Sequence, residues 1–365
     1  MDVMYMKKAI ELAKRGTGRT SPNPLVGAVV VKNGKIVGTG YHHKCGGPHA
    51  EIIALKKAGS LSRGADIYVN LEPCNHQGRT PPCTEAIIKA GIERVFVATR
   101  DPNPLVHGSG MKRLREAGVE VHEGPMEEEA VKMNEIFFKY IKTRLPFVAL
   151  KTAISIDGKI ATSTGESRWI TGVGARQHGH ILRNQYDAIL VGIGTVKKDN
   201  PRLTCRLPGK EGRNPIRIIV DSKLSIHHDA RVFDTDTAAS IIIATTHEAP
   251  LSRIEQIQKR ATILLINEGL EVDLSLLLKR LGEMEITSIL VEGGSRISGS
   301  FLTARLVDKY YCYIAPIIIG GERAPGAFGG EGISQLSDAS RLMDLSVTHL
   351  GEDLLVTGYL KSRYQ

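Results

Sequence analysis

One histidine, one glutamate and two cysteines constrain this chain most, because their chemistry requires separate segments to meet. They occur as His49-Ala50-Glu51, Pro73-Cys74 and Cys83. One imidazole and two thiolates are a typical donor set for Zn²⁺, and three protein ligands leave the fourth tetrahedral position open, as in catalytic rather than closed structural sites. The sequence therefore predicts one zinc ion held by His49, Cys74 and Cys83, with Glu51 beside it as a non-ligand.

The length and composition indicate a two-domain globular protein. At 365 residues the chain exceeds a typical single core, and it contains no apolar run of about 18 residues that could span a membrane. Its first residues lack the apolar stretch and cleavage site of a secretory signal. The five cysteines are widely spaced and odd in number, which favours reduced thiols used for metal over disulfides. We therefore expect a cytoplasmic protein without a membrane partner.

Basic residues outnumber acidic ones, and the surplus is uneven. The formal net charge is +9, and residues 1–145 hold 22 Lys and Arg against 15 Asp and Glu. Most of the surplus therefore lies in the half that carries the metal motif. It suits an anionic substrate such as a phosphate ester, or RNA, although a soluble surface can also simply be basic.

Hydrophobic periodicity in the first half predicts alternating helices and strands. We expect helices over 2–15, from His49 to about Ala58, from Cys83 to Gly91 and over 126–142. Expected strands cover 26–31, 35–40, 66–71 and 94–99. The first two strands are joined by Asn33-Gly34, a strong hairpin signal. Cys83 would then open a helix, where the dipole and free N–H groups favour its thiolate.

A domain boundary is expected at Arg144-Leu145-Pro146, which separates domains 1–145 and 146–365. A second α/β unit follows. Its expected strands cover 147–153, 188–191, 216–221, 240–244, 262–266 and 288–292, and 308–315 and 354–361 form an antiparallel closing pair.

The metal motif is close to a zinc-deaminase signature, H-x-E followed by P-C-x-x-C, although eight residues separate these two cysteines. Zinc would lower the pKa of a bound water to near neutrality, and the resulting hydroxide could attack an amidine-like ring carbon that carries an amine. Glu51 would carry a proton from the water to a ring nitrogen and then to the departing ammonia. The alternatives are a structural zinc site or no zinc. A structural site would need a fourth protein ligand, for which the candidates are Cys45, His42, His43 and His76.

Three runs around these residues closely resemble the bacterial bifunctional riboflavin-biosynthesis (RibD) family. They are Ser-Pro-Asn-Pro-Leu-Val-Gly over 21–27, Gly-Pro-His-Ala-Glu over 47–51 and Glu-Pro-Cys-Asn-His-Gln-Gly-Arg-Thr-Pro-Pro-Cys over 72–83. The resemblance implies a cytidine-deaminase-like three-layer α/β/α domain. It also implies deamination of a diaminopyrimidinone that bears a ribosylamino 5′-phosphate. Its substrate contacts fall on Asn23, Asp101 and Asn103.

The residues themselves favour a specialised pocket in this half. Asn23 lies between two prolines that stiffen its loop, so its amide could meet a base edge. His76 and Arg79 could close over the substrate, with Arg79 facing a phosphate. Asp101 and Asn103 follow a predicted strand end, where α/β proteins bind ligands, although Asn and Asp beside Pro are usually turn residues.

The second half shows no G-x-G-x-x-G dinucleotide motif. It does carry Gly-rich turns at 191–195 and 291–295 after apolar strands, where backbone N–H groups could meet a phosphate. The runs at 151–159, 167–171, 192–196, 199–204 and 291–294 resemble the reductase domain of the same family. That resemblance implies a dihydrofolate-reductase-like α/β fold and NADPH-dependent reduction of the ribosyl group to a ribityl chain.

The family's reductase contacts can be carried over by position. Expected NADPH contacts are Ala153, Trp169, Thr195, Asp199, Ser222, Gly294, Ser295, Arg296, Ile297, Ser298, Gly299 and Ser300. Expected substrate contacts are Ser167, Arg183, Leu203, Arg206 and Glu292. Among these, Arg183 and Arg206 could clamp a phosphate. Lys151, a catalytic candidate, could assist ring opening or protonate the developing amine together with Glu292.

Two rival functions remain open from the sequence: a nucleoside or tRNA deaminase with an appended domain, and a non-catalytic RNA-binding protein with a structural zinc. The long interval between the cysteines opposes the first rival. An aromatic content of 5% is low for base stacking and opposes the second. We expect a small phosphorylated pyrimidine as the substrate, no nucleic-acid partner and a homo-oligomer.

Overall fold

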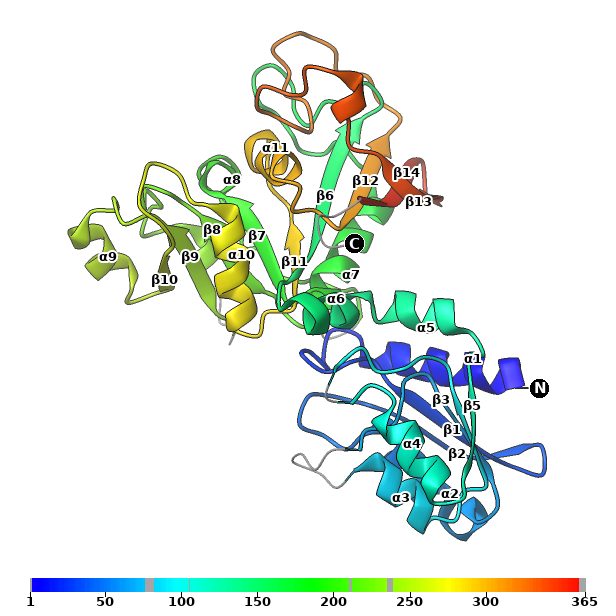
Figure 1. Cartoon of the computed structure of the whole chain (residues 1–365). Coiled ribbons are helices and arrows are strands. Elements are labelled where there is room, and N and C mark those ends of the chain that lie inside the picture. The colour runs from blue at the N-terminus through cyan, green and yellow to red at the C-terminus, as the bar shows by residue number, and fades with distance from the viewer. Residues whose placement is uncertain (1, 76–81, 105, 210–211, 235–238, 361–365) are drawn as a thin grey trace. The chain divides into compact units, whose positions relative to one another are not determined.

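The chain divides into two units with separate cores, Met1–Arg144 and Leu145–Gln365 (Figure 1). The computed structural model describes residues 2–75, 82–104, 106–209, 212–234 and 239–360. The last helix of the first unit is followed by its C-cap residue Arg144, which adopts a left-handed conformation with φ of 59°. Pro146 follows two residues later. A left-handed residue followed by proline is a common helix stop, so the local sequence ends the first unit here.

The first unit contains a five-stranded sheet in the order β2-β1-β3-β4-β5. Its strands are β1 Gly27–Lys32, β2 Lys35–Tyr41, β3 Asp66–Val69, β4 Arg94–Val97 and β5 Glu120–Glu123. Its helices are α1 Asp2–Ala13, α2 Ala50–Ala58, α3 Cys83–Lys89, α4 Ser109–Glu116, α5 Glu127–Met133 and α6 Glu135–Thr143, with 3₁₀ turns at Lys14–Gly16 and Gly59–Ser62.

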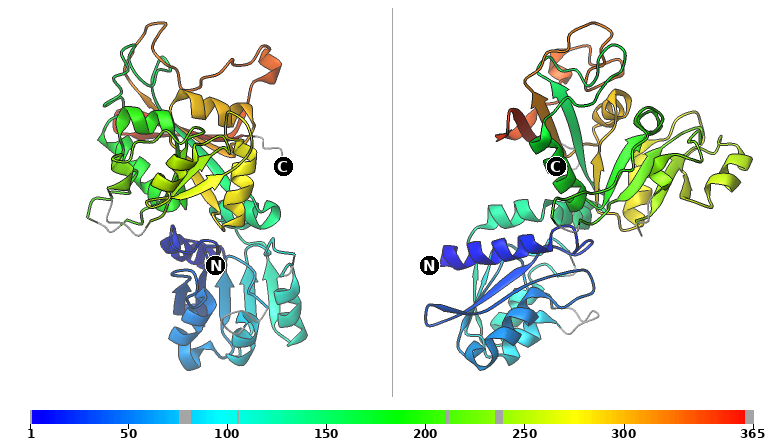
Figure 2. Two further views of the ribbon diagram at one scale, coloured as in Figure 1. Left: turned by 90° about the vertical axis from the view of Figure 1, so that its left-hand side faces the viewer. Right: turned by 180° about the vertical axis from the view of Figure 1, so that it is seen from behind.

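Strand alternation divides the apolar residues of this sheet between two faces, which gives the expected α/β/α layers (Figure 2). Ala28 and Val30 of β1 pack with α2, α3 and α4. Their neighbours Val29 and Val31 pack on the other face with α1 and Ala130 of α5. Since successive strand side chains point to opposite faces, an almost continuous apolar strand can serve two helical layers.

The expected hairpin between β1 and β2 is confirmed. The two strands pair antiparallel, and Asn33 and Gly34 both have positive φ, at 50° and 74°. A type I′ turn requires positive φ at both central residues, and its twist matches that of the flanking strands.

The single helix expected over 126–142 is wrong, because the chain forms two helices that break at Asn134. This side chain is buried, accepts a hydrogen bond from the N–H of Leu25 at 2.8 Å and donates one to the Leu25 carbonyl at 3.0 Å. A long-range contact of this kind overrides helical periodicity and cannot be read from a local window.

The second unit contains a nine-stranded mixed sheet in the order β10-β9-β8-β7-β11-β6-β12-β14-β13. Its strands are β6 Phe147–Ser155, β7 Ala188–Gly192, β8 Ile216–Val220, β9 Ile241–Thr245, β10 Thr262–Leu265, β11 Ser288–Val291, β12 Lys309–Ala315, β13 Leu342–Leu350 and β14 Asp353–Leu360. Its helices are α7 Val173–Gln185, α8 Ile193–Asp199, α9 Leu251–Ile257, α10 Leu274–Glu283 and α11 Ser295–Thr303, with 3₁₀ turns at Arg231–Phe233 and Leu336–Asp338.

In the sheet order, all strands from β10 at one edge through β9, β8, β7, β11 and β6 to β12 run parallel. Different helices cover the two faces of the sheet. Leu190 and Val291 pack with α10 and α11 on one face, whereas Ile189 and Val191 pack with α8 and α9 on the other. The carboxyl ends of β6, β7 and β11 therefore meet at one edge of the sheet (Figure 1), which is where open α/β sheets bind ligands.

The antiparallel closing pair is confirmed as β12 and β14. The structure adds the edge strand β13, which the sequence analysis did not predict. Most β13 side chains are exposed on both faces of the sheet, so this strand lacks the buried periodicity that marks the others. Among the described residues, no helix combines the length and apolar character needed to cross a membrane.

Candidate functional site

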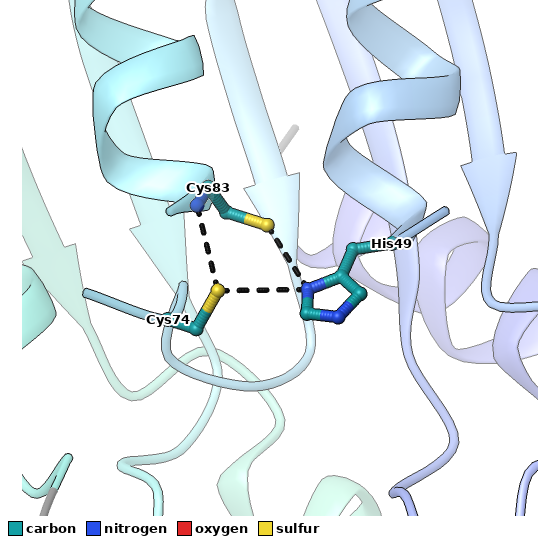
Figure 3. A group of neighbouring side chains, drawn as sticks. All are labelled: His49, Cys74 and Cys83. Carbon is teal, nitrogen blue, oxygen red and sulfur yellow. Dashed lines mark hydrogen bonds between the residues drawn. The ribbon is translucent and has the colours of Figure 1, made fainter. Parts of the chain in front are cut away.

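The three predicted metal ligands converge in the first unit, as Figure 3 shows. His49 immediately precedes α2, Cys83 is the first residue of α3, and Cys74 follows β3 in a loop. His49 Nδ1 lies 3.2 Å from Cys83 Sγ and 3.5 Å from Cys74 Sγ. Zinc bonds of about 2.0 Å to nitrogen and 2.3 Å to sulfur place tetrahedral ligands about 3.5 Å apart, so this donor set fits the ion.

No fourth protein ligand joins this cluster among the described residues. Their only group of metal-binding side chains within 4.8 Å is His49, Cys74 and Cys83. Two of the spare candidates are accounted for: Cys45 is an exposed free thiol, and the two ring nitrogens of His42 contact Asn23 and the Pro48 carbonyl. His76 lies outside the described residues, as does Arg79. The described donor set thus has the three-ligand composition of a catalytic site.

The hydrogen bonds around the two sulfurs converge on Cys74, whereas the sequence placed the helix-terminus effect at Cys83. Hydrogen bonds from the Cys83 thiol, His49 and the Cys83 backbone N–H lower the pKa of Cys74 to about 4, despite burial. The pKa of Cys83 is raised, because it shares its proton with Cys74 and is buried. The free N–H at the start of α3 points to Cys74 Sγ at 3.4 Å rather than to the sulfur of its own residue.

Glu51 lies in the first turn of α2, directly beside the ligands. Its side chain is 3% exposed, and its Oε2 has no hydrogen-bond partner among the described residues. Burial raises the pKa of Glu51, and the neighbouring Cys74 adds to this effect. A buried carboxylate oxygen without a partner is costly in a folded protein, which suggests that it meets a ligand instead.

Asn23 contacts His42, whose ring packs against the metal ligand His49. Its Nδ2 lies 3.2 Å from Nε2 of His42, and the His42 ring stands edge-on to His49 with centroids 5.6 Å apart. Because His42 Nδ1 lies 3.1 Å from the Pro48 carbonyl and must donate there, its Nε2 accepts from Asn23. The Asn23 amide oxygen is thereby turned away from His42.

Asp101 and Asn103 lie in the loop after β4 and make local turn contacts. Asp101 Oδ1 accepts the Asn103 N–H at 2.8 Å, and the Asn103 carbonyl accepts the N–H groups of Val106 and His107. These are the bonds expected of turn residues. The structure therefore shows what shapes the loop, while contact of these two side chains with a substrate stays a prediction.

Glu72, which was not among the predicted site residues, binds this loop to the segment that carries Cys74. Its buried carboxylate accepts four backbone N–H groups, from Asp101 at 3.2 Å, Gly108 at 2.9 Å, Gly110 at 2.9 Å and Met111 at 3.3 Å. Two of these donors begin α4, so Glu72 caps that helix from a distant part of the chain. Its position before Pro73-Cys74 was the available signal.

Gly110 permits this close docking. A Cβ at this position would lie 2.0 Å from the Pro73 carbonyl oxygen, so no larger residue fits against the backbone of the metal loop. Glu72 and Gly110 together hold the loop of Asp101 and the loop of Cys74 in one fixed relation.

Replacing Glu72 with glutamine is expected to loosen the start of α4. The glutamine amide offers one acceptor oxygen instead of two, and its NH₂ group would face backbone N–H donors. We expect the free energy of opening the start of α4 to fall by about 2–3 kcal/mol. Hydrogen exchange of the Gly110 and Met111 amides should accelerate about 100-fold, as measured by mass spectrometry. Glu85→Gln is the matched control, because the Glu85 carboxylate makes an exposed pair with Arg113. Equal exchange in both variants would remove Glu72 from this role.

The second unit holds a pocket of about 620 Å³ at the edge where β6, β7 and β11 end. Twelve of the expected reductase residues line it: Lys151, Ala153, Ser167, Trp169, Arg183, Thr195, Asp199, Leu203, Arg206, Glu292, Gly294 and Ser295. The structure thus brings together residues from five separate sequence runs.

Glu292, Arg183 and Lys151 form a buried charge cluster in this pocket. The Arg183 guanidinium binds Glu292 bidentately at 2.8 and 2.9 Å, and its third nitrogen donates to the Thr204 carbonyl at 3.1 Å. Lys151 Nζ lies farther from Glu292, at 3.9 Å. Arg183 and Lys151 lower the pKa of Glu292 to about 2 despite burial. Arg183 is therefore engaged by Glu292 in this structure, instead of being free to clamp a phosphate with Arg206.

Arg206 belongs to a separate basic group with Arg202 and Arg231, and all three line the pocket. Burial, together with the charges of Arg183, Arg202 and Arg231, lowers the pKa of Arg206. Like charges gathered in one cavity favour an anionic ligand. Arg202 and Arg231 were not among the expected contacts. Arg231 comes from a distant segment, and its backbone N–H donates a hydrogen bond to the Asn200 side chain at 2.7 Å.

Trp169 is 69% exposed and lies in the pocket wall, with the Arg176 guanidinium 4.6 Å from its ring centroid. Arg176 also donates to the Thr171 carbonyl at 2.6 Å, and Arg168 donates to the Asp199 carbonyl at 2.7 Å. These contacts hold the indole on the surface of the pocket, where a flat face is available for a ligand.

The remaining expected NADPH contacts do not line the pocket. Ser222 follows β8, and its Oγ accepts the Val272 N–H at 3.1 Å. Ile297 packs in the core, and Arg296 pairs with Glu271 at the surface. The other three lie on α11 as well. Ser298 is buried, and its Oγ has no hydrogen-bond partner among the residues that the structure describes. Gly299 packs closely against Gly329, and the Ser300 hydroxyl donates to the Arg296 carbonyl of its own helix.

Known proteins resemble both halves of this chain. A family model described as "Cytidine and deoxycytidylate deaminase zinc-binding region" matches residues 1–99, and "RibD C-terminal domain" matches residues 146–356. Riboflavin biosynthesis protein RibD of Actinobacillus pleuropneumoniae is 48% identical over 97% of this chain and 94% of the relative, and that of Bacillus amyloliquefaciens is 46% identical over 99% and 97%.

Solved structures agree with this assignment over the whole length. RibD of Acinetobacter baumannii has a TM-score of 0.89 at 37% identity, and it covers 99% of both chains. A diaminohydroxyphosphoribosylaminopyrimidine deaminase/5-amino-6-(5-phosphoribosylamino)uracil reductase from Thermotoga maritima has a TM-score of 0.87 at 42% identity with the same coverage. Because family models match both halves and relatives align over nearly the whole chain, this chain belongs to the RibD family of bifunctional deaminase/reductases of riboflavin biosynthesis.

Proposed function

We propose that this protein catalyses two successive steps of riboflavin biosynthesis in the cytoplasm. Residues 1–145 deaminate 2,5-diamino-6-ribosylamino-4(3H)-pyrimidinone 5′-phosphate to 5-amino-6-ribosylaminouracil 5′-phosphate. Residues 146–365 then reduce the ribosyl group to ribityl with NADPH. The observation that carries the proposal is that each unit has its own reactive centre: a three-ligand metal cluster beside Glu51 in one, and the basic pocket around Lys151 in the other.

His49, Cys74 and Cys83 hold the zinc of the deaminase unit. Zinc, when bound, lowers the pKa of a coordinated water so that it can act as a nucleophile near neutral pH. Glu51 would take a proton from the attacking water, whose oxygen forms a bond to the ring carbon that bears the amine, and would deliver this proton to the adjacent ring nitrogen of the pyrimidinone. It then carries a second proton to the exocyclic amine, the C–N bond breaks, and ammonia leaves as the carbonyl forms. Its Oε2 is buried and has no hydrogen-bond partner in the described part of the chain, which suits an atom that exchanges protons with a ligand.

Asn23, His76, Arg79, Asp101 and Asn103 are the proposed substrate contacts of this unit. The orientation of Asn23 supports its part, because His42 turns the amide oxygen away and leaves it available to an amino group of the pyrimidine. The Glu72 contacts support a fixed position for the loop that carries Asp101 and Asn103.

In the reductase unit, the pocket residues fit a nicotinamide dinucleotide. Gly294 precedes α11, whose first N–H groups suit a pyrophosphate, and Trp169 offers an exposed ring. We assign the NADPH contacts in the pocket to these two residues and to Ala153, Thr195, Asp199 and Ser295. Contacts outside the pocket lining stay predictions for Ser222, Arg296, Ile297, Ser298, Gly299 and Ser300. NADPH supplies a hydride when bound.

Substrate reduction needs a proton as well as a hydride. We assign its delivery to Lys151: the open-chain imine formed from the ribosylamine accepts hydride at C1′ and a proton at nitrogen, which gives the ribitylamine. Ser167, Arg183, Leu203, Arg206 and Glu292 are the proposed substrate contacts, and the basic group of Arg206, Arg202 and Arg231 suits the 5′-phosphate.

The full chain tests this proposal directly. Zinc content should be one ion per chain by elemental analysis, and the diaminopyrimidinone phosphate should give one ammonia and then one NADPH oxidised. Deamination of free cytidine or tRNA without turnover of the pyrimidinone phosphate would instead indicate a nucleoside or tRNA deaminase.

We also propose that the protein is a homo-oligomer. The edge strand β13 is nine residues long and exposes Leu345 and Val347, each more than 60% accessible. An exposed, apolar strand edge favours association with another chain. Light scattering of the purified protein would give a monomer mass if this is wrong.

A further inference from the structure

The ammonium group of Lys151 has little direct support from acidic neighbours. Lys151 is on β6, and Glu292 is the only carboxylate paired with it among the described residues, at 3.9 Å. Both oxygens of Glu292 already accept short hydrogen bonds from Arg183. A buried ammonium normally requires a close anion or several hydrogen-bond acceptors to remain charged. Another group therefore has to stabilise the Lys151 cation.

The ring of Tyr313 supplies such a group. Tyr313 lies on β12, which pairs with β6, and its side chain is 1% exposed. Lys151 Nζ is 5.4 Å from the centroid of this ring. The negative face of an aromatic ring attracts a cation within about 6 Å, and the attraction is stronger where water is excluded. Tyr313 thus offers Lys151 a partner that accepts none of the ammonium protons.

A hydrogen bond fixes the orientation of this ring. The Tyr313 hydroxyl lies 2.7 Å from Nδ1 of His178 on α7, and the two rings stand 5.9 Å apart. Burial raises the pKa of Tyr313 and lowers that of His178, so the neutral phenol donates to the neutral imidazole. The hydroxyl anchors one end of the side chain while its face remains toward Lys151.

We propose that Tyr313 is a positioning residue of the reductase reaction, whose aromatic face holds the Lys151 ammonium charged and leaves its protons free to point into the pocket. The inference rests on the proposed function of Lys151 as proton donor. A carboxylate at hydrogen-bond distance would hold the cation more strongly but would also occupy the proton that has to be transferred. The ring stabilises the charge without that competition.

The other charged and titratable groups around Lys151 do not replace the ring. Arg183 on α7 repels the ammonium, and burial lowers the pKa of Lys151, whereas Glu292 raises it. His180, also on α7, has its pKa lowered to about 4 by burial and the neighbouring arginines, so it is neutral in the working range. His178 is neutral for the reason given above. The balance among Glu292, Arg183 and Tyr313 therefore sets the charge of Lys151.

Three replacements of Tyr313 in the full chain test this role: phenylalanine, 3,4,5-trifluorophenylalanine and leucine. Phenylalanine keeps the ring face, trifluorophenylalanine keeps nearly the same shape but withdraws charge from the face, and leucine removes the ring. The readout is the pH dependence of kcat for NADPH oxidation on the deaminated intermediate. Ammonia release by the first unit is the internal control, and Tyr311→Leu is the control for losing a buried tyrosine from β12.

Loss of the ring face should lower the pKa of Lys151, so activity should disappear at a lower pH on the alkaline side. We expect the alkaline limb to move down by about one unit with leucine and trifluorophenylalanine. It should stay in place with phenylalanine and with Tyr311→Leu. Near the acid end of the range kcat should approach that of the unmodified enzyme, whereas a purely structural defect would lower kcat at every pH.

An unmoved limb with trifluorophenylalanine would overturn the proposal, even if the leucine variant fails to fold. An equal shift with phenylalanine would also overturn it, since the hydroxyl and not the ring would then be responsible. Failure of the underlying function is distinguishable, because Lys151→Ala would then retain full reductase activity, whatever the Tyr313 variants do.

Discussion

Glu51→Gln is expected to abolish ammonia release while one zinc ion stays bound per chain. Glutamine has nearly the same shape as glutamate and leaves His49, Cys74 and Cys83 intact, but it cannot accept and return a proton. Proton transfer by a positioned side chain contributes about 10²–10⁴-fold to rate. Because Glu51 would act at two proton transfers in each turnover, we expect a loss of about 10³-fold or more in kcat, measured by ammonia release.

The reductase unit provides the control for this experiment. NADPH oxidation on the deaminated intermediate should be unchanged in Glu51→Gln, since Glu51 packs in the core region of Met1–Arg144. Turnover within a few-fold of the unmodified protein would exclude Glu51 as the proton carrier. Loss of zinc together with activity would show that the residue supports the metal cluster instead. An RNA-binding protein with a structural zinc would keep its binding in this variant.

Lys151→Ala is expected to give the opposite pattern, with reduction lost and deamination retained. The substitution removes the proposed proton donor and leaves the Glu292–Arg183 pair in place at 2.8 Å. We expect kcat for NADPH oxidation to fall by about 10²–10⁴-fold, while NADPH affinity, measured by fluorescence titration, changes little. Unaffected reduction would remove Lys151 from the site.

Cys74→Ser is the reciprocal variant. Replacing one of three ligands should release the zinc and stop ammonia release, because a serine hydroxyl is a poor ligand for this ion. Reduction of the deaminated intermediate should continue at its normal rate. Loss of both activities in either variant would contradict independent sites in the two units.

Local sequence predicted the elements that depend on neighbouring residues. Asn33-Gly34 predicts the β1–β2 hairpin, because the turn requires positive φ at both of its central residues and these two residue types tolerate it. Apolar runs locate β6, β7, β8 and β11, since strands buried on both faces have few polar positions. The break at Asn134 and the strand β13 escaped prediction, the first because its cause lies at Leu25 and the second because its side chains are mostly exposed.

The candidate sites divide in the same way. The sequence by itself determined the metal donor set, Glu51 and the family, because ligand chemistry and motif spacing are local properties of His49, Cys74, Cys83 and their neighbours. Only the tertiary structure decided which groups face them. It shows that four backbone N–H groups converge on Glu72, that Arg183 engages Glu292, and that the ring of Tyr313 faces Lys151. These contacts join residues 29 to 162 positions apart, and their energies depend on burial and orientation, which no local pattern records.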